Sequence, residues 1–146
     1  MSLIDASCYP GAVYLGENMH GCQTIVLDCD GDHEMPIDLR TVAFMRELGK
    51  GTHIMDKPKR IDEYEGYEDS GIKIPASFHL TFKVDRIVPT MHFPWCHIDV
   101  VGNEKNSLRY IKNKIWNGQE PMLMTNEIWQ QLKEYVKRRK INAVSV

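Results

Sequence analysis

Two aspartates, Asp28 and Asp30, stand two residues apart, directly after the apolar strand candidate at residues 23–27. Side chains alternate between the two faces of a strand, so we expect both carboxylates on one face and close together. Such a pair repels itself unless a cation lies between the carboxylates, and Mg²⁺ or Mn²⁺ with oxygen ligands is the usual solution in phosphoryl transfer. The spacing predicts a divalent-metal site. Taken alone, residues 28–32 fit a polar turn with helix-capping duties equally well.

Two further short motifs place polar side chains on strands. Ser77 and His79 would share one face of a strand whose other face carries Phe78 and Leu80, and a hydroxyl beside an imidazole suits a triphosphate. Asp99 lies in a third apolar segment and would supply the carboxylate that two metal ions about 3.5–4 Å apart need as a shared ligand. The three motifs together favour phosphate chemistry.

The elements that must position these residues follow from periodicity. We expect strands at 23–27, 77–84 and 96–101, with weaker strands at 12–15, in a hairpin, and at 108–111. Residues 56–71 are charged and poor in apolar residues, so we expect a long surface loop there. A helix is expected over 36–48, and a second over 126–140 with Thr125 as its N-cap. Their apolar stripes would be Leu39, Val42, Met45 and Leu48, and Ile128, Leu132, Tyr135 and Val136.

Composition sets the limits of the interpretation. With 146 residues, 42% of them apolar, the chain is long enough for one domain, which we expect to span residues 1–146. It has no run of about 18 apolar residues, so we expect a soluble, intracellular protein with no membrane partner. Its four cysteines include no C-x-x-C pair, which argues against a zinc ribbon or a disulfide framework.

The net charge of −2 neither requires nor excludes a nucleic-acid partner. Five cations nevertheless fall within residues 133–140. They fit a template-holding surface or a solvated helix end. The aromatic residues Trp95 and Trp116 likewise fit either base stacking or ordinary packing.

The order of the motifs carries a resemblance. D-x-D after an apolar strand, then S-x-H, then a hydrophobic residue before aspartate resembles the signature of the archaeo-eukaryotic primase superfamily, here Asp28 and Asp30, Ser77 and His79, and Ile98 and Asp99. It is closest to the primase-polymerase branch of phages and plasmids and extends over residues 11–135. The resemblance implies an α+β fold, an RRM-like primase catalytic core with a mixed β-sheet and flanking helices. It also implies either a minimal catalytic domain or the core of a longer protein.

The same resemblance implies a function. The chain would be a metal-dependent nucleotidyltransferase that joins nucleoside triphosphates on a single-stranded DNA template, with a helicase or accessory domain as a partner, in the cytoplasm of a bacterial host. Asp28, Asp30 and Asp99 would be the catalytic carboxylates that bind Mg²⁺ or Mn²⁺, and Ser77 with His79 would contact the nucleotide phosphates. Lys83 and Arg109 are candidate phosphate-binding cations near the site.

Two other functions remain open at this stage. His79-Leu80-Thr81 and His97-Ile98-Asp99 are similar to the paired motifs of a metal-independent 2H phosphodiesterase, in which two histidines act as acid and base. That interpretation gives Asp28 and Asp30 no role. A non-catalytic module that binds single strands or nucleotides is the third possibility.

Overall fold

The computed structural model describes residues 23–31, 34–68, 70–84, 88, 90–101 and 115–144. The strands predicted at 12–15 and 108–111 lie outside these residues. In chain order the elements are β1 (Gln23–Asp30), α1 (Leu39–Leu48), β2 (His53–Arg60), the 3-10 turn η1 (Ile61–Glu63), β3 (Lys73–Val84), β4 (Met91–Phe93), the 3-10 turn η2 (Pro94–Cys96), β5 (Ile98–Val101), β6 (Ile115–Trp116), β7 (Met122–Leu123) and α2 (Asn126–Val144).

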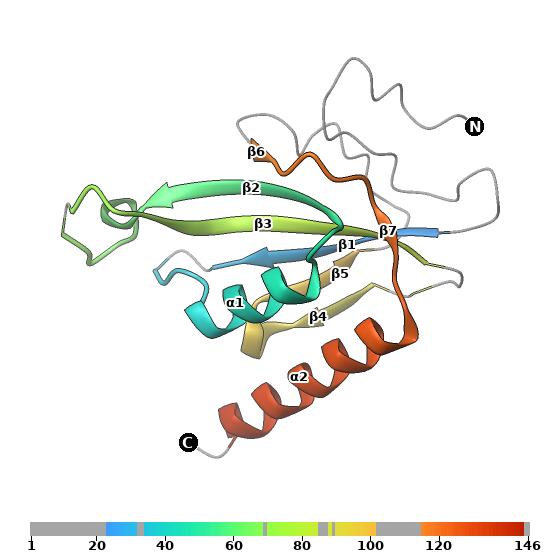
Figure 1. The fold of residues 1–146 in the computed structure, drawn as a ribbon. Helices are drawn as coiled ribbons and strands as arrows, with labels where there is room; N and C mark the ends of the chain where they lie inside the picture. Colours follow the sequence, from blue (N-terminus) through green and yellow to red (C-terminus); the bar gives the residue numbers. More distant parts are fainter. Residues whose placement is uncertain are drawn as a thin grey trace.

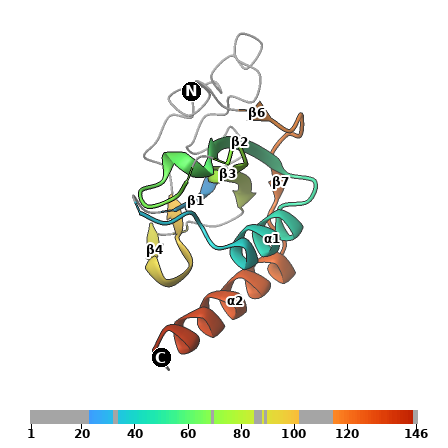
Figure 2. The same ribbon diagram turned by 90° about the vertical axis from the view of Figure 1, so that its left-hand side faces the viewer.

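The strands of the described residues form one seven-stranded sheet in the order β4-β5-β1-β3-β2-β6, and β7 pairs with β3. All pairings along this order are antiparallel, whereas β7 runs parallel to β3. Both helices lie on the same face of the sheet (Figures 1 and 2). The predicted α+β class is therefore confirmed. Within the described chain, no helix combines the length and apolar character needed to cross a membrane.

Strict alternation along the central strands builds the core. From Ile25 in β1, from Phe78 in β3 and throughout β5, every second residue is apolar and faces the helices. These residues share one buried cluster: Ile25, Leu27, Cys29, Phe78, Leu80, Phe82, Val84, Ile98 and Val100. The helices complete this cluster with Val42, Met45, Leu132 and Val136. The intervening residues lie on the opposite face, where the predicted chemistry is found.

Helix α1 begins three residues later than predicted. Its N-cap is Asp38, whose carboxylate accepts hydrogen bonds from the backbone N–H groups of Arg40 at 2.8 Å and Thr41 at 3.1 Å. Leu39, predicted in the apolar stripe, is the first helical residue and is 71% exposed, so that prediction was wrong. Ile37, just before the cap, is buried in its place and belongs to the same core cluster as Val42, as in a hydrophobic staple.

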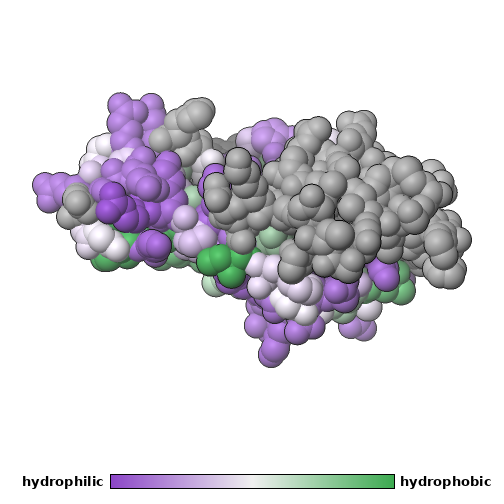
Figure 3. Space-filling view, turned by 90° about the horizontal axis from the view of Figure 1, so that it is seen from above, coloured by the Kyte–Doolittle hydropathy of each residue, from purple (hydrophilic) through white to green (hydrophobic). Residues whose placement is uncertain are grey.

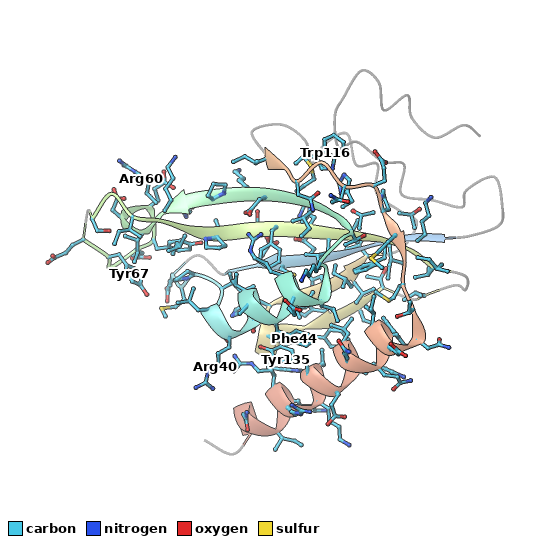
Figure 4. The ribbon with its side chains drawn as sticks, in the orientation of Figure 1. Arg40, Phe44, Arg60, Tyr67, Trp116 and Tyr135 are labelled. Atoms are coloured by element: carbon cyan, nitrogen blue, oxygen red, sulfur yellow. The ribbon has the colours of Figure 1, made fainter. Side chains whose placement is uncertain are left out.

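Helix α2 was predicted more closely. The Thr125 hydroxyl accepts a hydrogen bond from the Ile128 N–H at 3.2 Å, which confirms the predicted N-cap. The helix packs on α1 through the stacked rings of Phe44 and Tyr135, whose centroids are 4.0 Å apart. Figure 4 shows the two side chains between the helices. The Tyr135 hydroxyl also lies 2.7 Å from that of Thr41. The predicted stripe does face the core, with Leu132 and Val136 buried and Ile128 and Tyr135 partly buried.

The long surface loop predicted over 56–71 was wrong in its first third. Residues up to Arg60 belong to β2, which pairs with β3 along its whole length, with a register shift at Lys57 and Pro58. Backbone hydrogen bonds hold this hairpin together and need no apolar side chains, so the hydropathy pattern missed the strand. Figure 3 looks onto the face opposite the helices and shows hydrophilic residues gathered over this end of the hairpin.

The third predicted strand starts late. Residues 94–96 form η2, and His97 follows in a left-handed conformation with φ 56°, so β5 begins only at Ile98. Pro94 at the first position of the turn favours this geometry. β1 and β3 are both longer than predicted, and β1 continues through Asp30. The aspartate pair therefore belongs to a strand, and the polar-turn interpretation was wrong.

Candidate metal centre

The register of the sheet gathers the predicted residues on one face. Asp28 lies directly opposite His79 of β3 on one side and Asp99 of β5 on the other, and Asp30 lies opposite Ser77. Directly opposed residues on antiparallel strands point to the same face. The shared face that alternation predicted within each strand is thus confirmed, and the pairing adds which residue of each motif meets which.

Three of these side chains converge. Asp28, Asp30 and His79 each offer one ligand atom, and these atoms all lie within 4.8 Å of one another. The His79 Nε2 lies 2.8 Å from the Asp28 Oδ1, with the two side chains only 7% and 13% exposed. Two carboxylates and one imidazole so close together form a group that could hold a metal ion.

The donor set indicates which kind of ion would fit. Carboxylate oxygens suit hard cations such as Mg²⁺ and Mn²⁺, whereas an imidazole more often binds Zn²⁺ or Fe²⁺. The Cys29 thiol, between the two aspartates in sequence, points into the core on the other face of β1 and is fully buried. Burial, with the nearby Asp28 and Asp30 carboxylates, raises the pKa of Cys29 well above its ordinary value. Cys29 is therefore a neutral core thiol and adds no soft ligand to the site.

Glycine at position 31 lets the chain fold closely over the end of β1. A Cβ at Gly31 would lie only 2.7 Å from the Met35 carbonyl oxygen and 2.7 Å from the Ile37 nitrogen. Both atoms are backbone, so they cannot yield cheaply. The Gly31 N–H donates to the Ala76 carbonyl at 3.2 Å, which fixes the strand ends that carry the D-x-D and S-x-H motifs beside each other.

Asp99 lies beside the convergent group and is not part of it. Its carboxylate contacts the His92 Nδ1 on β4, the next strand outward, and its side chain is 38% exposed. The structure therefore places the third predicted metal-binding carboxylate directly opposite Asp28 on the neighbouring strand, with its oxygen directed at His92. Neither the sequence pattern nor the resemblance pointed to this pair.

His97 has a backbone role that the sequence did not indicate. Its carbonyl accepts a hydrogen bond from the Asp30 N–H at 3.1 Å. It is also the non-glycine residue with positive φ in the described chain, a conformation that costs free energy for most side chains. His79 lies on β3 and His97 lies at the start of β5, on opposite sides of β1. Two strand spacings, about 10 Å, therefore separate the backbones of the two histidines.

Sequence reasoning missed one cation on this face. Lys57 of β2 lies opposite Ser77, which itself lies opposite Asp30, so the three form a second row across the sheet. Lys57 is exposed. In the sequence, Pro58 and the surrounding charges made the segment resemble a loop.

The two predicted phosphate-binding cations stand apart from the centre. Lys83 is exposed on the same face of β3 but lies four residues beyond His79, roughly 13 Å at the usual rise of a strand. Arg109 lies outside the described residues. On position alone, Lys57 is nearer to the aspartate pair than Lys83.

Comparisons with models of known protein families, with curated protein sequences and with solved structures found no match to this chain.

Proposed function

We propose that this chain is a metal-dependent nucleotidyltransferase of the primase-polymerase type, which joins nucleotides on a single-stranded DNA template. The observation that carries the proposal is the convergence of Asp28, Asp30 and His79 on one sheet face. The α+β sheet with both helices on the other face is compatible with the RRM-like catalytic core that the motif order implies.

The side chains divide the work by position. Asp28 and Asp30 bind Mg²⁺ or Mn²⁺, with His79 beside them and Asp99 opposite Asp28 as a further carboxylate. When bound, the metal activates the 3′-hydroxyl and offsets the negative charge that develops at phosphorus. Ser77 donates a hydrogen bond to the nucleotide phosphates.

Lys57 extends this phosphate site. It occupies the row of Asp30 and Ser77, two strand spacings or about 10 Å from Asp30. A lysine side chain spans much of that distance, so its ammonium can meet a triphosphate that lies across Ser77. The acids thus face the reacting end of the nucleotide, and the hydroxyl and the cation face its phosphates.

The experiment is incorporation of labelled nucleoside triphosphates on single-stranded and primed DNA with Mn²⁺ or Mg²⁺. We expect product that EDTA abolishes and that His79→Ala reduces. Hydrolysis of a cyclic phosphate that continues in EDTA and needs both His79 and His97 would instead identify a 2H phosphodiesterase.

A binding module without catalysis gives a different result. The parent would then form no product under any metal condition, and Asp28→Asn/Asp30→Asn would bind DNA as tightly as the parent or more tightly, because the variant removes repulsion from the phosphates.

A further inference from the structure

A cavity of about 370 Å³ opens between the β4 edge of the sheet and helix α2, on the face opposite the metal centre. β4 and η2 lie above α2 in Figure 1. Nine of the described residues line the cavity: the apolar Met91, Leu132 and Val136, the aromatic Phe93, Trp95 and Trp129, and the cationic Lys133, Lys137 and Lys140. No aspartate or glutamate is among the described residues that line it. We call this cavity the α2 groove.

The aromatic walls are held by defined contacts. Trp95 belongs to η2, and its indole Nε1 donates a hydrogen bond to the Val136 carbonyl of α2 at 2.9 Å. Phe93 is next to this turn on β4, with its ring centroid 6.0 Å from that of Trp95. Trp129 comes from the first half of α2. The rings therefore line the groove from both sides of the joint between sheet and helix.

The cations follow one face of α2. Lys133 and Lys137 are four residues apart, and Lys140 follows three residues later, so all three lie along the same side of the helix. The Lys133 Nζ lies 6.0 Å from the centroid of the Trp129 ring, and the Lys140 Nζ lies 5.6 Å from that of Trp95. Each of these rings therefore has an ammonium group beside it at the rim.

We propose that the α2 groove binds single-stranded nucleic acid, with bases against the aromatic rings and phosphates on the lysines. Stacking rings along a positively charged groove are the two features by which proteins hold single strands without regard to sequence. An acidic peptide would match the charge as well. The pairing of an ammonium with a ring, repeated twice, matches the repeat of phosphate and base in a nucleic acid.

The position of the groove relates it to the metal centre. β4 is the edge strand, and alternation sends His92 toward Asp99 while Phe93 faces the α2 groove. β4 therefore separates the two regions, and a strand of DNA that passes over this edge connects them. The identification of the bound strand as the template rests on the proposed function; the binding itself does not.

The test is fluorescence anisotropy of a labelled oligothymidine of about 20 nucleotides, longer than the roughly 4–16 that one binding domain covers. EDTA is present throughout, so that the metal centre does not contribute. We expect Lys133→Ala/Lys137→Ala/Lys140→Ala to bind roughly tenfold or more weakly than the parent. The slope of log affinity against log salt should fall by about 2, at about 0.7 for each phosphate that a lysine no longer neutralises. All three lysines are exposed, so the variant should fold normally.

The matched control removes three exposed cations outside helix α2: Arg40→Ala/Lys50→Ala/Lys73→Ala. It changes the net charge equally, and we expect at most about a twofold loss of affinity. A second measurement uses intrinsic fluorescence. The chain has three tryptophans, and in Trp116→Phe the remaining two both line the α2 groove. Oligothymidine should quench their emission.

Three results would overturn the inference. They are equal affinity of the groove variant and the parent, equal losses in the groove and control variants, and quenching by a peptide of alternating glutamate and leucine but not by oligothymidine. The proposed function is judged separately. A parent that forms no product yet binds oligothymidine through the groove contradicts only the nucleotidyltransferase, whereas product formation with an unaltered affinity in the groove variant contradicts only the groove.

Discussion

The two faces of the central strands obey different rules. On the face toward the helices, the central parts of β1, β3 and β5 present apolar side chains that belong to a single buried cluster. On the other face the same strands present carboxylates, a hydroxyl and an imidazole at neighbouring positions. Burial of apolar side chains is enough to define the first face. The second face depends on the pairing of residues across the strands, and its neighbouring carboxylates repel one another.

The strongest test of this contrast is Asp28→Asn/Asp30→Asn. We expect nucleotide incorporation to fall at least about 10³-fold, because two of the three converging donors lose their charge. Folding stability should stay about equal, since the repulsion between the acids disappears while an asparagine at position 28 can still form a hydrogen bond with the His79 Nε2. Initial rates and urea unfolding of the same samples check this. A variant that unfolds more easily than the parent would show that the pair is structural.

The opposite behaviour is expected on the core face of β3, at Phe78, one residue from Ser77 of the site face. Phe78→Ala on the core face should lower the free energy of unfolding by about 3–5 kcal/mol, because the ring is only 1% exposed and leaves a cavity. Ser77→Ala is the control on the site face and should cost less than about 1 kcal/mol while weakening nucleotide binding. Chemical denaturation of both variants measures the difference. Similar losses at the two positions would mean that the faces are not distinct.

Burial of the Cys96 thiol predicts that the free energy of unfolding depends on pH. Burial raises the pKa of Cys96 from 9.0 to about 11, so the unfolded chain releases this proton first. Stability from this thiol is complete below pH 9.0 and is lost as pH rises toward about 11. The parent should therefore lose about 2 kcal/mol more than Cys96→Ala over that range, at 1.36 kcal/mol per pKa unit. Urea unfolding at the two ends of the range checks this, and parallel losses in the two proteins would exclude the effect.

The sequence predicted the core face well. Residues such as Phe78 and Ile98 alternate with polar neighbours, and alternation needs no knowledge of strand order. It also placed Asp28 with Asp30, and Ser77 with His79, because each pair shares one strand. What it could not supply was pairing between strands, which depends on backbone hydrogen bonds and not on hydropathy.

Two residues illustrate that limit. Lys57 was assigned to a loop because its segment is charged and contains Pro58, yet pairing with β3 makes it a strand. Asp99 was expected to share the metal, but β4 brings His92 within reach of its carboxylate. The three-residue strand β4 is too short to give a periodic signal, so nothing in the sequence indicated the competitor.

The smallest expected effect tests the row of residues across the sheet that Asp30, Ser77 and Lys57 form. Lys57→Ala should weaken binding of a fluorescent nucleoside triphosphate, with Mn²⁺ present, by about fivefold, since an exposed cation opposite Ser77 contributes about 1 kcal/mol to a phosphate contact. Lys59→Ala is the matched control: the same charge is removed from the same strand, but the Lys59 Nζ lies over the Tyr64 ring, 4.2 Å from its centroid. Equal weakening by both variants would mean that only the general charge of the hairpin matters. The expected result is that Lys57→Ala weakens binding and Lys59→Ala does not. If Lys57→Ala causes no further weakening in a protein that already carries Ser77→Ala, the hydroxyl and the ammonium act on the same phosphates. The strand register then positions the phosphate site.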